Sequence, residues 1–190
     1  LRIRRDLGDK PGTARMLLNT AVVAFLERNL DEARVLLGET QALCGELGMT
    51  WEGSRASHLL ALTLAGQGQA ADARRLMIRN LTVLRDLGAM RELAELMASM
   101  LVSWRPGDAG DSDSSVRIAA AGARLFDQLG IPMPPPLRAR VDRTLDELRA
   151  HVGKERTDAW WKEGSEMSWT DAITYAERGT RGHAPSAHES

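Results

Sequence analysis

The sequence predicts an all-α protein, an α-solenoid of stacked helical hairpins that ends in a C-terminal helical cap. Three observations support this fold class. Alanine, leucine and arginine dominate the 190 residues and aromatic residues make up only 4%, a composition that favours helix over sheet. Several sequence markers recur at a step of about 40 residues, as in repeat proteins. No segment alternates apolar and polar residues as an amphipathic strand does.

The repeat is clearest in its Leu-Gly pairs, whose successive spacings are 40, 40 and 42 residues. These pairs are Leu7-Gly8, Leu47-Gly48, Leu87-Gly88 and Leu129-Gly130. The string DEAR at 31–34 likewise precedes ADAR at 71–74 by 40 residues. A two-helix unit cannot bury both of its apolar faces alone, so stacked neighbours must supply the missing partner.

Each repeat is expected to form two helices. The expected pairs are 12–28 with 30–47, 51–67 with 70–87, and 90–104 with 115–129, the last pair being separated by a long polar loop at 105–114. Asn29 is expected to cap its helix, with Glu32 completing a capping box. Gly48 is expected to end that helix in the left-handed conformation.

Small residues occur where the two helices of a hairpin are expected to cross. Ala21 and Ala61 fall in the middle of their helices, twelve residues before Ala33 and Ala73. Side chains of this size let two helix axes approach closely.

The end of the chain departs from the repeat. After a proline-rich stretch at 131–136, helices are expected over 136–152 and 154–163, the latter ending at Gly164. Ser168 is expected to cap a last helix with Asp171 as its partner. Trp160, Trp161 and Trp169 are expected to cover the last repeat. The predicted organisation is therefore repeats at 1–130, capping helices at 131–178 and a flexible tail at 179–190.

Composition excludes several classes of function. The formal net charge of −1 argues against a surface that binds nucleic acid or anionic membranes. A single cysteine, Cys44, excludes an intrachain disulfide and a cysteine-rich zinc site. No apolar run is long enough to span a membrane, residues 1–10 are no signal peptide, and we expect a cytoplasmic protein. The chain opens without Met, as if cut from a longer one.

The sequence offers no catalytic, cofactor-binding or metal-binding residues. Cys44 lies on an apolar helical stripe and is expected in the core. Asp108, Asp111 and Asp113 have the alternating spacing of a calcium loop, but its twelfth position is Ala119 instead of Glu. His183 and His188 are not at the spacing of a helical ligand pair. A phosphate-binding loop and a helix-turn-helix are both absent.

Partner-binding residues are instead expected on the concave face, which the first helices of the hairpins would line. The candidates are Arg15, Leu18, Arg55, His58 and Glu95, of which Arg15, Arg55 and Glu95 occupy equivalent repeat positions. For each of them an ordinary solvated surface position is the alternative, and His58 could also be partly packed.

Several strings resemble the tetratricopeptide (TPR)-like C-terminal region of bacterial signal-transducing ATPases, the STAND proteins, which include LuxR-like transcriptional regulators. The strings are LGDKPGTAR at 7–15, NLDEAR at 29–34, GIPMPP at 130–135, WWKEG at 160–164 and MSWTDA at 167–172. Met167 and Asp171 stand where that family usually has Leu and Glu. The resemblance covers roughly 1–178 and implies a non-catalytic sensor or interaction arm, with ATP hydrolysis and DNA binding elsewhere in a larger protein.

The resemblance implies a protein or peptide partner, or other domains of the same polypeptide, with no direct nucleic acid and no membrane partner. The alternatives are a module that binds a small effector and an autoinhibitory intramolecular module, with a kinase or cyclase as a further output. The partner, the effector and the oligomeric state are not encoded in any recognisable motif.

Overall fold

The described part of the chain is helical outside its turns. The computed structural model describes residues 9–102 and 112–181, with no strand among them, and the all-α prediction is confirmed. Over this range nine helices follow one another: α2 (Lys10–Leu26), α3 (Leu30–Leu47), α4 (Thr50–Gly66), α5 (Ala70–Asp86), α6 (Met90–Val102), α7 (Ser112–Gln128), α8 (Pro135–Val152), α9 (Lys154–Glu166) and α10 (Trp169–Arg181). None of the described helices has the length and apolar character needed to span a lipid bilayer.

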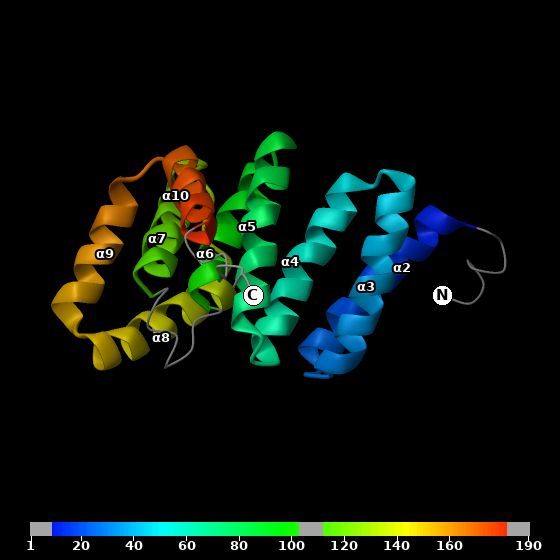
Figure 1. The fold of residues 1–190 in the computed structure, drawn as a ribbon, viewed down its shortest axis with the longest axis horizontal. Helices are drawn as coiled ribbons and strands as arrows, with labels where there is room; N and C mark the ends of the chain where they lie inside the picture. The colour runs from blue at the N-terminus through cyan, green and yellow to red at the C-terminus, as the bar shows by residue number, and fades with distance from the viewer. Residues whose placement is uncertain (1–8, 103–111, 182–190) are drawn as a thin grey trace, which may run out of the picture. The chain divides into compact units, whose positions relative to one another are not determined.

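The chain forms two compact units that divide between Ala89 and Met90. In the first unit α2 packs on α3, α4 packs on α5, and α3 packs on α4, so two helical hairpins stack in sequence order (Figure 1). In the second unit α6 and α7 form a third hairpin, α8 packs on α6, and α9 and α10 pack on α7. The third hairpin therefore groups with the C-terminal helices, whereas the sequence analysis grouped it with the repeats.

The three Leu-Gly markers that lie in the described residues share one backbone conformation after their helices. Gly48, Gly88 and Gly130 all have φ 65°, a left-handed conformation that glycine adopts without steric cost. The amide of Met49 then donates to the carbonyl of Cys44 at 2.9 Å, which satisfies a carbonyl in the last turn of α3. The predicted role of Gly48 is confirmed.

Two of the expected helix starts differ. The Asn29 side chain makes no capping hydrogen bond to α3; its Nδ2 donates to Glu32 Oε2 at 2.6 Å, so the predicted capping box is wrong. Ser168 does cap α10, because its Oγ accepts from the amide of Asp171 at 3.0 Å and donates to Asp171 Oδ2 at 2.6 Å. Asp9, which the sequence analysis did not single out, caps α2 through the amide of Gly12 at 2.9 Å.

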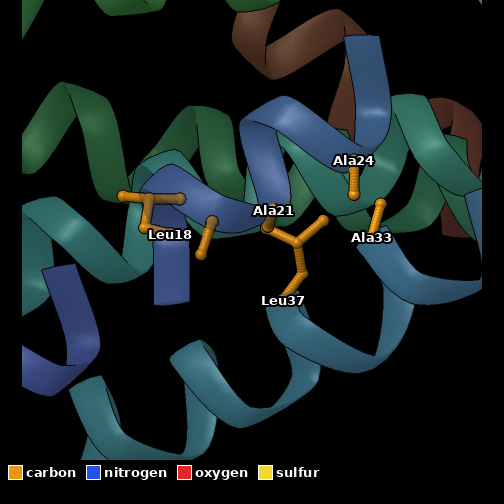
Figure 2. Close-up of a cluster of buried hydrophobic side chains, with 6 residues drawn as sticks. Leu18, Ala21, Ala24, Ala33 and Leu37 are labelled. Carbon is orange, nitrogen blue, oxygen red and sulfur yellow. The ribbon is translucent and has the colours of Figure 1, made fainter. Parts of the chain in front are cut away.

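The core of the first hairpin is built from small residues. Ala21 and Ala33 are fully buried, as are their repeat equivalents Ala61 and Ala73. Figure 2 shows Ala24 of α2 opposite Ala33 of α3, with Leu37 beside Ala21. The expected close approach of the two helices is therefore present in both hairpins of the first unit.

Two glycines of the second unit lie where helices pack closely. A Cβ on Gly122 of α7 would lie 2.7 Å from the Met97 Cβ and 2.9 Å from the Ala98 amide nitrogen of α6. A Cβ on Gly164 would collide with the backbone carbonyl oxygen of Arg117. Gly164 was expected to end its helix, but α9 continues to Glu166, and the residue serves instead for the close approach of α9 to α7.

Two arginines of α7 hold the C-terminal helices. Arg117 Nε donates to Glu163 Oε2 at 2.7 Å and its Nη1 donates to Asp113 Oδ2 at 2.8 Å. Burial alone would lower the pKa of Arg117, but these hydrogen bonds raise it above its ordinary value. Arg124 Nη1 donates to the carbonyls of Ser165, Glu166 and Met167 at 3.0–3.3 Å, where α9 ends. A cation at a helix C-terminus is favourable.

Some sequence predictions lie partly or wholly outside the described residues. Helix α10 reaches Arg181, three residues into the segment expected to form a tail. His183 and His188 lie beyond it. In the polar loop expected at 105–114, residues 105–111 are not described, and these include Asp108 and Asp111.

Candidate functional site

A groove in the first unit is the best candidate for a binding site. Its walls come from α3 and α5 and its floor from α4, and we call it the α3–α5 groove. It consists of two adjoining cavities of about 450 and 360 Å³, and Gln41 lines both. All of its lining residues fall between positions 34 and 83, so the groove is complete within one unit.

One end of the groove, which we call its basic end, is rich in arginine. Its lining residues are Arg34 and Gln41 of α3, Leu60 and Leu64 of α4, and Gln69, Asp72, Arg75, Leu76 and Arg79 from the start and body of α5. Three guanidinium groups therefore face one carboxylate. The leucines beneath them are buried or half-buried and form an apolar floor.

The arginines at this end differ in what they contact. Arg75 forms an ion pair with Asp72, one turn earlier on α5. Arg34 Nη1 donates to the neutral amide oxygen of Gln69 at 3.3 Å. Arg79 is exposed and makes no hydrogen bond or ion pair with any residue that the structure describes. Two of the three positive charges therefore have no carboxylate beside them.

The other end of the groove, its uncharged end, is lined by small and uncharged residues. They are Gln41, Cys44, Gly45, Gly48, Met49, Thr50, Gly53, Ser54, Ser57, Asn80 and Val83. The position that a Cβ on Gly53 would occupy is 3.4 Å from the Cys44 Cβ, so α3 and α4 lie close together here. This end is uncharged because it has no acidic or basic side chain, and the raised pKa of the Cys44 thiol keeps that group protonated at neutral pH.

Hydrogen bonds between helices fix the floor and walls of the groove. Asn80 is 3% exposed; its Oδ1 accepts from Ser54 Oγ at 2.8 Å and its Nδ2 donates to the Ser54 carbonyl at 3.0 Å. Gln41 Nε2 donates to Ser57 Oγ at 2.8 Å across α3 and α4. A buried amide with both of its polar atoms bonded restrains α4 and α5 in one register.

The chemistry of nucleophilic catalysis is not assembled in the groove. Burial raises the pKa of the Cys44 thiol, and the negative charge of Glu52 raises it further, so the unreactive protonated form is favoured. The predicted core position of Cys44 is confirmed, since the side chain is buried. Across the described ranges there is no group of three His, Cys, Asp or Glu residues that could hold a metal ion.

Among the five predicted partner contacts, Leu18 is contradicted by the structure. It is 3% exposed and packs in the core cluster with Ala21 and Leu37, so no partner can reach its side chain. The buried face of α2 is broad and includes position 18, so the Leu18 side chain points toward the neighbouring helices.

The other four predicted contacts are at least partly accessible. Arg15 Nε donates to Glu52 Oε1 at 3.0 Å, and Arg55 lies over the ring of Trp51 at 5.0 Å from its centroid. Glu95, which belongs to the second unit, pairs with Arg91 at 3.3 Å. His58 is half-buried on α4.

The basic end lies outside the predicted contacts, because those were expected only on the first helices of the hairpins. The relevant arginines lie on or beside the second helices, α3 and α5. A usable signal was present, since Arg75 and Arg79 stand four residues apart and such residues share one face of a helix. That α3 contributes Arg34 to the same groove depends on how the two hairpins stack.

No family model, curated protein or solved structure matches this chain.

Proposed function

We propose that this chain is a non-catalytic, TPR-like interaction arm that binds a protein or peptide partner through its first unit. The observation that supports the proposal is the α3–α5 groove, an open channel with an apolar floor, charged groups at one end and small residues at the other. Sites that hold a partner combine apolar surface with a few placed polar groups, and the groove has both.

The length of the groove suits a peptide. Along α3 it extends from Arg34 to Gly48. At 1.5 Å of rise per residue this stretch is about 20 Å long. An extended peptide covers about 3.3 Å per residue, so about six residues would fit along the groove. The small side chains at the uncharged end leave room for a peptide backbone to lie close to the helices.

On the resemblance of its terminal strings, we also propose that the arm belongs to a larger cytoplasmic signal-transducing ATPase that regulates transcription. In that protein the arm would sense a partner and relay its binding to ATPase and DNA-binding parts elsewhere. The partner would then be either a separate protein or a segment of the same polypeptide.

A tryptophan placed in the groove tests the proposal. No atom lies within 4 Å of the Cβ position at Gly45 or at Gly38, and both glycines are on exposed turns of α3, but only Gly45 lines the groove. Gly45→Trp should therefore fill the groove without harming the fold, and Gly38→Trp is its matched control. Random peptides displayed on phage would be selected against the purified chain, and their affinities measured by fluorescence anisotropy.

We expect the selected peptides to bind the wild type and the Gly38→Trp variant equally, and to lose binding to Gly45→Trp. Selected peptides that bind all three proteins alike would place the binding surface outside the groove. A selection that enriches no peptide would count against the function itself.

The size of the two cavities favours one alternative, a small effector. Both volumes fall in the range of about 300–1,000 Å³ that is typical of small-molecule sites. A thermal-shift screen against metabolites distinguishes this case, because a ligand that binds only the folded state raises the melting temperature. A metabolite that stabilises the wild type but not Gly45→Trp would support it.

A further inference from the structure

We propose that the occupant of the α3–α5 groove is an acidic peptide segment. Its carboxylates would face Arg34, Arg75 and Arg79, and its apolar side chains would rest on the leucines of the floor. This inference rests on the proposed function and deepens it by naming the chemistry of the partner.

The basic end carries an excess of positive charge. Its lining residues carry three positive charges and one negative charge, and Arg75 already neutralises that carboxylate, Asp72. Arg34 contacts only a neutral amide, and Arg79 has no partner among the described residues. The whole chain has a net charge of −1, so this excess is a local property of the groove. An anionic partner would compensate it.

The arrangement of the charged groups also suits carboxylates. Guanidinium groups bind carboxylates through two parallel N–H···O bonds, which gives both attraction and orientation. Arg75 and Arg79 are one turn apart on α5, and Arg34 lies on the opposite wall. Carboxylates between the walls would thus meet donors from both sides.

Apolar surface next to the arginines favours a peptide over other anions. Leu60, Leu64 and Leu76 form an apolar surface beneath the arginines, and the uncharged end continues the groove beyond them. A bare phosphate would use the arginines alone, and a nucleic acid backbone would carry charge along the uncharged end. A peptide with acidic residues at one end and apolar or small residues at the other matches the whole groove.

The test uses two labelled peptides of about twelve residues and anisotropy titrations of the full chain. One peptide carries several glutamates in one half and leucine and alanine in the other; the second has glutamine in place of every glutamate. We expect the acidic peptide to bind about tenfold more tightly or better, which is the effect of one or two good charge contacts. Its affinity should fall as salt rises from about 0.05 to about 0.5 M, because salt screens exposed charges.

Two pairs of arginine substitutions identify the site. Arg34→Gln with Arg79→Gln removes the two charges without a carboxylate partner, and should weaken the acidic peptide about tenfold but leave the glutamine peptide unchanged. Arg138→Gln with Arg143→Gln removes the same charge from exposed positions of α8, outside the groove, and should change neither affinity. Circular dichroism of both double variants checks that they remain folded, as expected for exposed arginines.

The outcomes separate this inference from the proposed function. If both peptides bind equally and Gly45→Trp blocks both, the groove binds peptides but the acidic preference is wrong. If neither these peptides nor any selected peptide binds, the proposed function falls with it. If inorganic phosphate displaces the acidic peptide at concentrations close to the Kd of that peptide, a bare anion suffices and a peptide occupant is ruled out.

Discussion

At the scale of single residues, Gly164 and Cys44 show how the place of a residue in the fold determines its role. Gly164 reads in the sequence as a helix end, yet it lies inside α9, where its missing side chain lets α9 rest on the backbone of α7. The sequence shows that a glycine stands at this position. The reason for it is the packing of α9 on α7, two helices that are far apart in the sequence. Cys44 was predictable as a core residue because it lies on an apolar stripe.

Replacing Gly164 with alanine should destabilise the protein. The new Cβ would meet the carbonyl oxygen and Cα of Arg117, which are backbone atoms and cannot move aside as a flexible side chain can. We expect a loss of about 1–3 kcal/mol in the free energy of unfolding, as for other overpacked sites. Gly45→Ala, with nothing near its Cβ, should instead be neutral or stabilising by up to about 1 kcal/mol. Urea denaturation followed by circular dichroism compares the two.

Cys44 should react slowly with thiol reagents while the chain is folded. Burial and the charge of Glu52 raise the pKa of its thiol, so the folded state favours the protonated form. The resulting stabilisation is fully present below the unfolded-state pKa and is lost as pH rises through the folded-state pKa. Labelling by a disulfide reagent at pH 8 should therefore be much slower than in urea. Equal rates in both conditions would contradict this burial.

At the scale of helices, some of the ends that have a local signal were predictable. The turn glycines and the Ser168 cap depend on residues within one turn of each other, and the structure has them as expected. Asn29 fails as a cap because its side chain binds the carboxylate of Glu32 in preference to a backbone amide. The groove was not predictable, because its walls belong to α3 and α5, two helices that are separated in the sequence by α4 and are brought together by stacking.

Ser168 and Asn29 should differ in their contribution to stability, because only Ser168 caps a helix. Ser168→Ala removes a side chain that accepts the amide hydrogen of Asp171, and should cost about 1 kcal/mol. Asn29→Ala removes no capping bond to α3, so its cost should be smaller, within about 0.5 kcal/mol, as at other surface sites. Thermal denaturation of the two variants, measured side by side, tests this order. A larger loss for Asn29→Ala would reverse it.

At the scale of the whole molecule, the α3–α5 groove and the C-terminal packing belong to different units. Every residue of the groove lies before Ala89, whereas Gly164, Arg117 and Arg124 lie after Met90. The sequence predicted the hairpins of both units but placed the boundary near residue 130, because the third pair of helices keeps the repeat spacing. Its packing partners, α8, α9 and α10, decide to which unit it belongs.

This separation predicts that damage to the second unit spares peptide binding. Gly164→Ala should weaken the packing of α9 on α7. Because the groove belongs to the other unit, its affinity for the acidic peptide should stay within about twofold of wild type, a difference of under about 0.5 kcal/mol. Anisotropy titrations at a temperature where the variant is fully folded make the comparison. A tenfold weaker complex would show that the groove depends on the second unit.

The identical turns at Gly48 and Gly88 have a consequence for how such a chain grows. Both glycines have φ 65° in the turn after their helices. Residues 49–88 therefore begin and end at equivalent points of the repeat and form a cassette. Duplicating this cassette would require no new turn, and each added copy would carry its own version of the arginine-bearing second helix. A protein that grew by such duplication would gain one more groove of this kind with each added copy.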